Sequence, residues 1–224
     1  MPATNPARSF VVSVVLALGL AACGSAGDAS PGASTTPSGP TTTHPLDAEV
    51  PAALAASVRT AAALQFGSSA SKIAVGFDDS LSRAGCTGLA AFTTDRMHPG
   101  RLNFVVLPDQ RLAGDKPRGD AAVVEVVRRC GTGASADWWA YVITSLSDDV
   151  GGLPVRDDTR ASANPLLRRA GIGFAPPTIT VQADGATEIW FHAFSYDVNQ
   201  LVDVRARLGR DDEFTATVTK LATG

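Results

Sequence analysis

Hydrophobic and polar residues follow three different patterns along this 224-residue chain. Residues 10–22 form an apolar run in which Ser13 is the single polar side chain. Residues 24–45 contain no large apolar residue and consist mainly of Ser, Thr, Pro, Gly and Ala. From residue 46 onward, apolar residues recur with the periods typical of helices and strands. The chain therefore divides into a leader, a linker and one folded domain over residues 46–224.

The folded domain is predicted to begin with a helix over residues 50–66. Pro51 suits the first helical turn, and Gly67 is a typical residue to end a helix. Four apolar residues at intervals of four positions make one face of this helix: Leu54, Val58, Ala62 and Phe66.

Residues 120–130 contain four valines, which favours a strand. However, Val123, Val127 and Cys130 fall on one helical face, Asp120 can cap the first turn, and two arginines occupy the last turn. We therefore predict a helix here.

The remaining periodic segments predict strands. Those before residue 147 cover residues 72–77, 89–93, 102–107 and 138–145. Residues 147–170 are polar and interrupted by Gly and Pro, which indicates a long loop or a junction between subdomains.

The alternation of apolar and polar residues is clearest in the C-terminal part of the chain. Residues 178–183 and 186–194 flank Asp184-Gly185, which predicts a hairpin with a two-residue turn. Residues 201–208 and 213–221 also alternate, although a helix over 198–208 is the alternative for the first of them. Four consecutive strands indicate a C-terminal meander. The predicted class is α+β, with the N-terminal helix packed on a mainly antiparallel sheet.

Strand alternation also assigns the two faces of this meander. One face would form a core against the helix at 50–66; its members are Ile179, Val181, Ile189, Phe191, Val202, Val204, Phe214, Ala216 and Val218. The opposite face would carry Glu188, Trp190, His192, Phe194, Asp203, Arg205 and Arg207.

The opposite face supplies the candidate binding residues Trp190, His192, Phe194, Arg205 and Arg207. An aromatic row beside arginines can bind a sugar, an aromatic ligand or a protein partner. The alternative is that a second layer, such as the strand predicted at 138–145, covers the aromatic side chains.

The leader, residues 1–22, bears on where the protein is located. Its apolar run is too short to span a bilayer alone and fits the core of a signal peptide. It ends in Leu20-Ala21-Ala22-Cys23, followed by Gly24, which resembles the lipobox of bacterial lipoprotein precursors. The resemblance covers the first 25 residues. It implies cleavage before Cys23 and attachment of acyl chains to that residue.

On this prediction, residues 1–22 are a signal peptide, and residues 23–45 are a lipidated Cys23 with a disordered linker. Two acyl chains suffice for stable anchoring, so the protein would be held on the extracytoplasmic side of the cell membrane. Such a compartment is oxidising, and the two remaining cysteines, Cys86 and Cys130, are predicted to form a disulfide.

Charge excludes one class of partner. The chain has 19 basic and 22 acidic residues, a formal net charge of −3, and no basic run. This composition does not favour nucleic-acid binding. The expected partners are the membrane, through the anchor, and an unidentified envelope ligand or protein.

Motifs for catalysis are few. Ser69-Ala70-Ser71-Lys72 satisfies the S-x-x-K pattern, in which Lys72 could activate Ser69, and it resembles the nucleophile motif of serine β-lactamases and penicillin-binding proteins. The S-D-N and K-T-G elements of those families are missing. No cofactor or metal is expected. A non-catalytic binding domain is therefore the favoured function, and an envelope serine hydrolase is the alternative.

Overall fold

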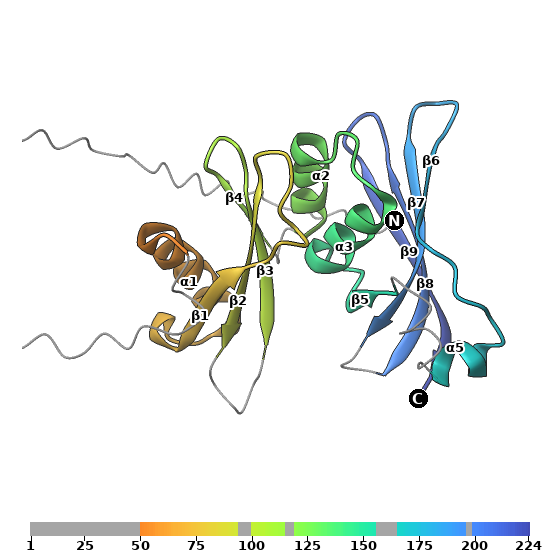
Figure 1. The fold of residues 1–224 in the computed structure, drawn as a ribbon, viewed down its shortest axis with the longest axis horizontal. Helices are drawn as coiled ribbons and strands as arrows, with labels where there is room; N and C mark the ends of the chain where they lie inside the picture. The colour runs from red at the N-terminus through yellow and green to blue at the C-terminus, as the bar shows by residue number, and fades with distance from the viewer. Residues whose placement is uncertain (1–49, 94–99, 115–118, 156–164, 196–198) are drawn as a thin grey trace, which may run out of the picture. The chain divides into compact units, whose positions relative to one another are not determined.

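A computed structural model describes residues 50–93, 100–114, 119–155, 165–195 and 199–224, which belong to one compact unit. Two antiparallel sheets and several helices confirm the α+β class (Figure 1). Cys23, the signal peptide and the linker lie outside the described residues. Within the described ranges, no helix is long and apolar enough to cross a membrane.

The first sheet, called sheet A here, is a four-stranded meander in the order β1-β2-β3-β4. Its strands are β1 (Ile73–Phe77), β2 (Thr87–Thr93), β3 (Arg101–Val106) and β4 (Leu112–Gly114), and a short 3-10 turn, η2 (Ala70–Lys72), precedes β1. The strands predicted at 72–77, 89–93 and 102–107 are thereby confirmed.

The first helix, α1 (Ala52–Phe66), covers one face of sheet A. Val58 and Ala62 are fully buried against the sheet, and Leu54 and Phe66 pack at the edge of the same cluster, as their spacing predicts. Gly67 ends the helix with a φ of 61°, a left-handed conformation that glycine adopts without strain.

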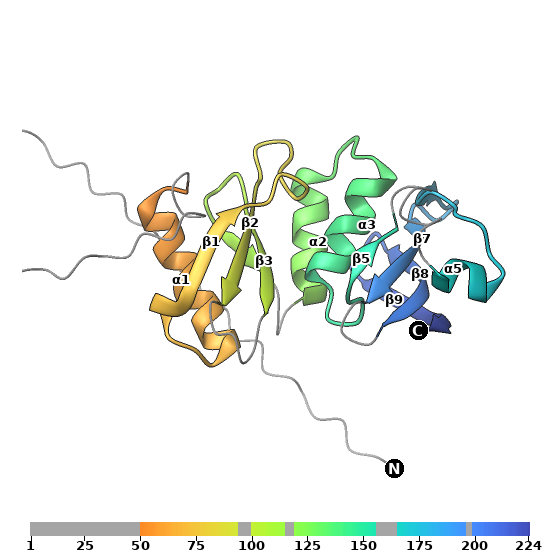
Figure 2. The same ribbon diagram turned by 60° about the horizontal axis from the view of Figure 1, so that its bottom comes forward.

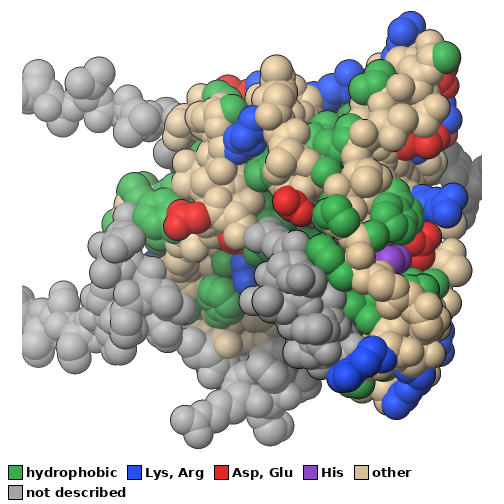
Figure 3. All heavy atoms as spheres, turned by 45° about the vertical axis from the view of Figure 1, so that its right-hand side comes forward, with side chains coloured by type: hydrophobic (Ala, Val, Ile, Leu, Met, Phe, Trp, Pro, Cys, Tyr) green, Lys and Arg blue, Asp and Glu red, His purple; other side chains and the backbone are tan. Residues whose placement is uncertain are grey.

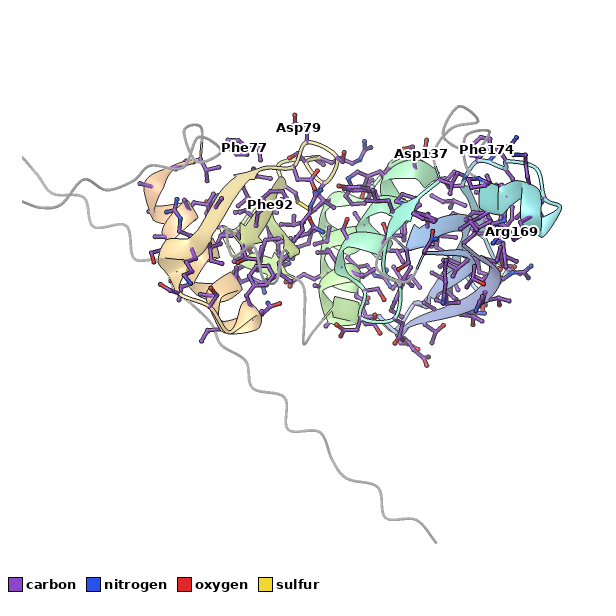
Figure 4. The ribbon with its side chains drawn as sticks, turned by 90° about the horizontal axis from the view of Figure 1, so that it is seen from below. Phe77, Asp79, Phe92, Asp137, Arg169 and Phe174 are labelled. Carbon is purple, nitrogen blue, oxygen red and sulfur yellow. A yellow bond between two sulfur atoms is a disulfide. The ribbon has the colours of Figure 1, made fainter. Side chains whose placement is uncertain are left out.

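The opposite face of sheet A packs on two further helices, α2 (Gly119–Cys130) and α3 (Ala136–Leu146). The helix predicted at 120–130 is confirmed, with Val123, Val127 and Cys130 buried. The strand predicted at 138–145 is wrong, because these residues belong to α3. Ser135 caps α3 by accepting a hydrogen bond from the backbone N–H of Trp138, and Asp137 lies in its first turn (Figure 4).

The second sheet, sheet B, has the order β5-β7-β8-β9, with β6 also paired to β7. Its strands are β5 (Leu153–Pro154), β6 (Thr178–Val181), β7 (Thr187–Ser195), β8 (Gln200–Leu208) and β9 (Phe214–Thr223). The predicted meander is confirmed, and the helical alternative for 198–208 is wrong. The segment 147–170 is not a continuous loop, because it contains β5 and the short helix α5 (Pro165–Ala170).

Helices α2 and α3 contact both sheets, so they form a layer between sheet A and sheet B (Figures 1 and 2). The inner face of sheet B packs on this helical layer through Ile189, Phe191 and Val204, each no more than 1% exposed. The expectation that this face packs on α1 is wrong, because α1 covers sheet A instead. Two residues predicted for this face lie outside the core, Val181 at 70% exposure and Val218 at 39%, because each is on a strand at an edge of the sheet.

The β6–β7 hairpin is longer than the two-residue turn predicted for it. The N–H of Gly185 donates to the carbonyl of Gln182, and the N–H of Gln182 donates to the carbonyl of Ala186. Three residues, Ala183 to Gly185, therefore form the loop, with Gly185 at a φ of 79°. This is the arrangement of a type I turn followed by a left-handed glycine.

The structure joins Cys86 and Cys130 in a disulfide, with Cα atoms 6.1 Å apart. Cys86 precedes β2 and Cys130 ends α2, so the bond ties sheet A to the helical layer. Both residues are buried in the cluster that includes Trp138 and Val127.

Candidate functional site

Described residues cover the outer face of sheet B, the one turned away from the helical layer, at one end only. Helix α5 packs there against β8 and β9, burying Leu201 and Ala222. Phe194 is partly buried in the same cluster, together with Phe174, which follows α5 (Figure 4). The second layer expected from the sequence thus exists over Phe194, but α5 supplies it.

The uncovered end of this face carries two rows of side chains, one on each of two neighbouring levels of the sheet. Strand pairing places Thr178, Trp190, Arg205 and Thr217 in the first row and Thr180, Glu188, Arg207 and Thr215 in the second. Together they line a groove with a volume of about 520 Å³. Figure 3 brings this side of the molecule forward, with hydrophobic, basic and acidic side chains close together around the histidine.

Trp190 lies in the middle of this groove and is half-buried. Its indole N–H donates a hydrogen bond to Oδ1 of Asp203 on the neighbouring strand β8. Its ring meets the ring of His192 edge to face, with centroids 5.0 Å apart. These two contacts fix the orientation of the indole before any ligand arrives.

His192 is the buried member of this group, with 6% exposure. Its Nε2 lies 3.6 Å from Oδ1 of Asp203, and its Nδ1 is buried without a hydrogen-bond partner among the described residues. Burial lowers the pKa of His192, and the nearby Asp203 carboxylate opposes that shift only in part. The imidazole is therefore held neutral at pH 7 and packs beside Trp190 on the same face of the sheet.

The two arginines of the groove differ in their pairing. Arg207 forms ion pairs with Asp184 and with Glu188. Arg205 contacts Asp203 at 3.4 Å, and its side chain is 76% exposed. A backbone N–H from Ala186 and the Arg207 side chain together lower the pKa of Asp184. Arg205 therefore has more of its guanidinium available to a ligand than Arg207.

The structure brings four of the predicted binding residues together and separates the fifth. Trp190, Arg205 and Arg207 line the groove, His192 lies beside Trp190 at its border, and Phe194 belongs to the α5 cluster. The four threonines of the groove were missed. Alternation on β6 and β9 places them on the same face as Trp190, so the signal was present in the sequence.

A second polar cluster lies between sheet A and α3. The side chain of Asp78, 6% exposed, pairs with Arg101 and accepts a hydrogen bond from the hydroxyl of Tyr141 at 3.0 Å. Arg101 also lies over the ring of Phe92 (Figure 4). Burial, followed by the charge of Asp78, raises the pKa of Tyr141. Because each polar group here has a partner, the cluster is a structural link between the layers.

The S-x-x-K residues do not form a shielded pair. Ser69 and Lys72 are both exposed, at the turn that precedes β1. The Ser69 hydroxyl lies 2.7 Å from that of Ser71 and also accepts from the backbone N–H of Ser71, as a capping residue does. A nucleophile and base require a cleft with oxyanion donors, and this exposed turn offers poor support for one.

Among the described residues, no group of three or more His, Cys, Asp or Glu side chains is placed to hold a metal ion. Comparisons of the chain with models of protein families, with curated proteins and with solved structures find no match.

Proposed function

We propose that this chain is a lipid-anchored protein of the bacterial cell envelope, whose folded domain binds a ligand without transforming it. The anchor is supported by the lipobox-like sequence at Cys23 and by the Ser/Thr/Pro/Gly-rich segment that follows it. That segment, residues 24–45, has the composition of a flexible tether and would hold the domain on the order of 25 Å from the membrane surface.

One observation carries the binding role: the groove on the outer face of sheet B has an aromatic side chain at its centre and charged and hydroxyl groups around it. A few fixed polar groups beside an apolar surface are typical of ligand sites. The neighbouring end of the same face is closed by α5, whereas no described residue closes this end. The groove is therefore the surface to which we assign binding.

The anchor is tested by intact mass spectrometry of the membrane-fraction protein from a bacterial host. The expected species begins at Cys23 and carries acyl chains, and Cys86 and Cys130 together are two hydrogens lighter than the reduced pair. A Cys23→Ala variant should lose both the acyl mass and the membrane association. A full-length, unmodified wild-type chain in the soluble fraction would contradict the anchor.

The groove is tested by oxidation with N-bromosuccinimide, with the modified tryptophans located by peptide mass spectrometry. Trp138 and Trp139, buried in α3, are internal controls. We expect Trp190 to be oxidised in the purified protein and protected when a detergent-solubilised bacterial envelope fraction is added. Equal oxidation of Trp190 with and without that fraction would count against a binding role for the groove.

A further inference from the structure

We infer that the groove recognises an uncharged polysaccharide, bound as an extended segment across the strands; this inference depends on the proposed binding function. The groove joins an aromatic surface to balanced charges and to a ring of hydroxyl groups, and it is open rather than enclosed. Each of these properties limits the chemical class of ligand that the groove can bind.

Charge argues against an anionic ligand. Each groove arginine already has an acidic partner: Arg207 pairs with Asp184 and Glu188, and Arg205 with Asp203. Arg210 also acts on the charge of Asp184, so three arginines and three carboxylates lie here and their charges balance. An anion would have to compete with these carboxylates, whereas a neutral ligand would leave the ion pairs in place.

The polar groups suit sugar hydroxyls. Every hydroxyl of a sugar both donates and accepts a hydrogen bond, so a complementary surface needs donors and acceptors side by side. Threonine hydroxyls do both, guanidinium groups donate, and carboxylates accept. The exposed groove residues supply this mixture on all four strands: Thr178, Thr180, Glu188, Arg205, Arg207, Thr215 and Thr217.

Trp190 supplies the apolar part of the site. Sugar rings present C–H groups that pack on aromatic surfaces, and a fixed indole loses little conformational freedom when it binds. Asp203 and His192 already hold the Trp190 side chain in one orientation. The indole is thus prepared to receive a sugar ring whose hydroxyl groups can reach the polar side chains of both rows.

The dimensions favour a polymer over a small molecule. Sites for small molecules are usually concave and bury most of the ligand. Here seven lining side chains are exposed and Trp190 is half-buried, so the groove is shallow. It extends across four strands from β6 to β9, which at about 4.8 Å per strand spacing is about 14 Å. Several sugar rings of an extended chain can lie along this length.

The test uses full-length protein purified in detergent and analysed by affinity electrophoresis in gels that contain one polysaccharide each. The neutral probes are hydroxyethyl cellulose, soluble starch, dextran and galactomannan, and the anionic probes are polygalacturonate and heparin. We expect at least one neutral polysaccharide to retard the protein and neither anionic polymer to do so. Retention of the native fold by each variant is checked by circular dichroism.

Trp190→Ala should lower the affinity for the retarding polysaccharide by about tenfold, since it removes the stacking surface. Phe77→Ala is the matched control, because Phe77 is an exposed aromatic residue of sheet A (Figure 4), and it should leave the affinity unchanged. Arg205→Ala should also weaken binding, because it removes the more exposed guanidinium donor of the groove. Arg168→Ala, on the exposed surface of α5, is its matched control and should leave the affinity unchanged.

Three results would overturn the inference. If no neutral polysaccharide retards the protein, the ligand class is wrong. If an anionic polymer binds and Trp190→Ala weakens it, the ligand class is wrong but the groove remains a binding site. If a neutral polysaccharide binds equally well to Trp190→Ala, the site is wrong. The oxidation experiment distinguishes these results from failure of the proposed binding function. If that function fails, Trp190 is oxidised equally with and without the envelope fraction.

Discussion

The indole N–H of Trp190 on β7 donates its hydrogen bond to the carboxylate of Asp203, the residue that lies one level further along the neighbouring strand β8. The same carboxylate lies beside His192 and Arg205. Asp203 therefore positions the aromatic centre of the groove, and substitutions at this residue separate its role as an acceptor from its role as a charge.

Asp203→Ala should lower the free energy of unfolding by about 1–2 kcal/mol, because it leaves the indole N–H of Trp190 without its acceptor. Asp203→Asn retains a carbonyl oxygen and should lose less. Urea denaturation at pH 7, followed by circular dichroism, measures both. Equal losses in the two variants would show that the negative charge, and not the hydrogen bond, stabilises this part of sheet B.

His192 should make the protein less stable in mild acid. Because burial lowers its pKa in the folded state below the ordinary value of 6.5, the unfolded state binds more protons as the pH falls through and below that value. The stabilisation that the neutral imidazole provides is therefore complete above pH 6.5 and is lost progressively below it. Urea midpoints measured from pH 7.5 down to pH 5 follow this loss.

His192→Gln, which cannot titrate, is the comparison for that experiment. The wild type should be more stable than this variant at pH 7.5, and the difference in the free energy of unfolding should shrink as the pH falls. Only the wild type is destabilised by protonation of residue 192 in the unfolded state. A difference that stays constant with pH would contradict the assigned pKa shift. The comparison also removes the contribution of the carboxylates that titrate in both proteins.

Gly88 on β2 should not tolerate a side chain. A Cβ at this position would collide with the backbone oxygen of Asp78 and approach Leu81 Cβ to 2.5 Å. Gly88→Ala should therefore cost about 1–3 kcal/mol, as overpacked cores do. Gly173→Ala is the matched control, because nothing lies within 4 Å of its added methyl group. Thermal unfolding of the two variants should differ clearly; similar melting temperatures would contradict the close approach.

Loss of the disulfide should destabilise the domain strongly. The bond joins residues 44 positions apart, and the chain-entropy estimate for a loop of this length is about 4 kcal/mol. Cys86→Ala combined with Cys130→Ala should therefore shift the urea midpoint far below that of the oxidised wild type. Reduced wild-type protein should resemble the double variant. A double variant as stable as the oxidised protein would rule out this contribution.

Helix α3 shows where sequence patterning fails. Its residues 138–145 are almost all apolar and rich in aromatic and β-branched side chains, which favours a strand. In the fold, α3 contacts β3 on one side and β7 on the other, so it is buried around its circumference and has no polar face. The cap at Ser135 and the acidic Asp137 were the local signals of a helix.

The candidate site was more predictable than the layers around it. Alternation alone placed Trp190, Arg205 and Arg207 on one face of sheet B, and the structure confirms that placement. It could not show that α5 covers Phe194 or that α1 packs on a different sheet, because such contacts join segments far apart in the sequence. The division into two sheets likewise has no local signature.

The Cys86–Cys130 bond has a consequence for proteolysis of the chain. Strands β2, β3 and β4 and helix α2 all lie between the two bonded cysteines. A protease that cuts the chain once within this interval leaves both fragments covalently joined. The C-terminal fragment would still carry the groove of sheet B, and the N-terminal fragment would still lead back to Cys23. With Cys23 anchored as proposed, a single nick would therefore not release the half of the chain that carries sheet B from the membrane.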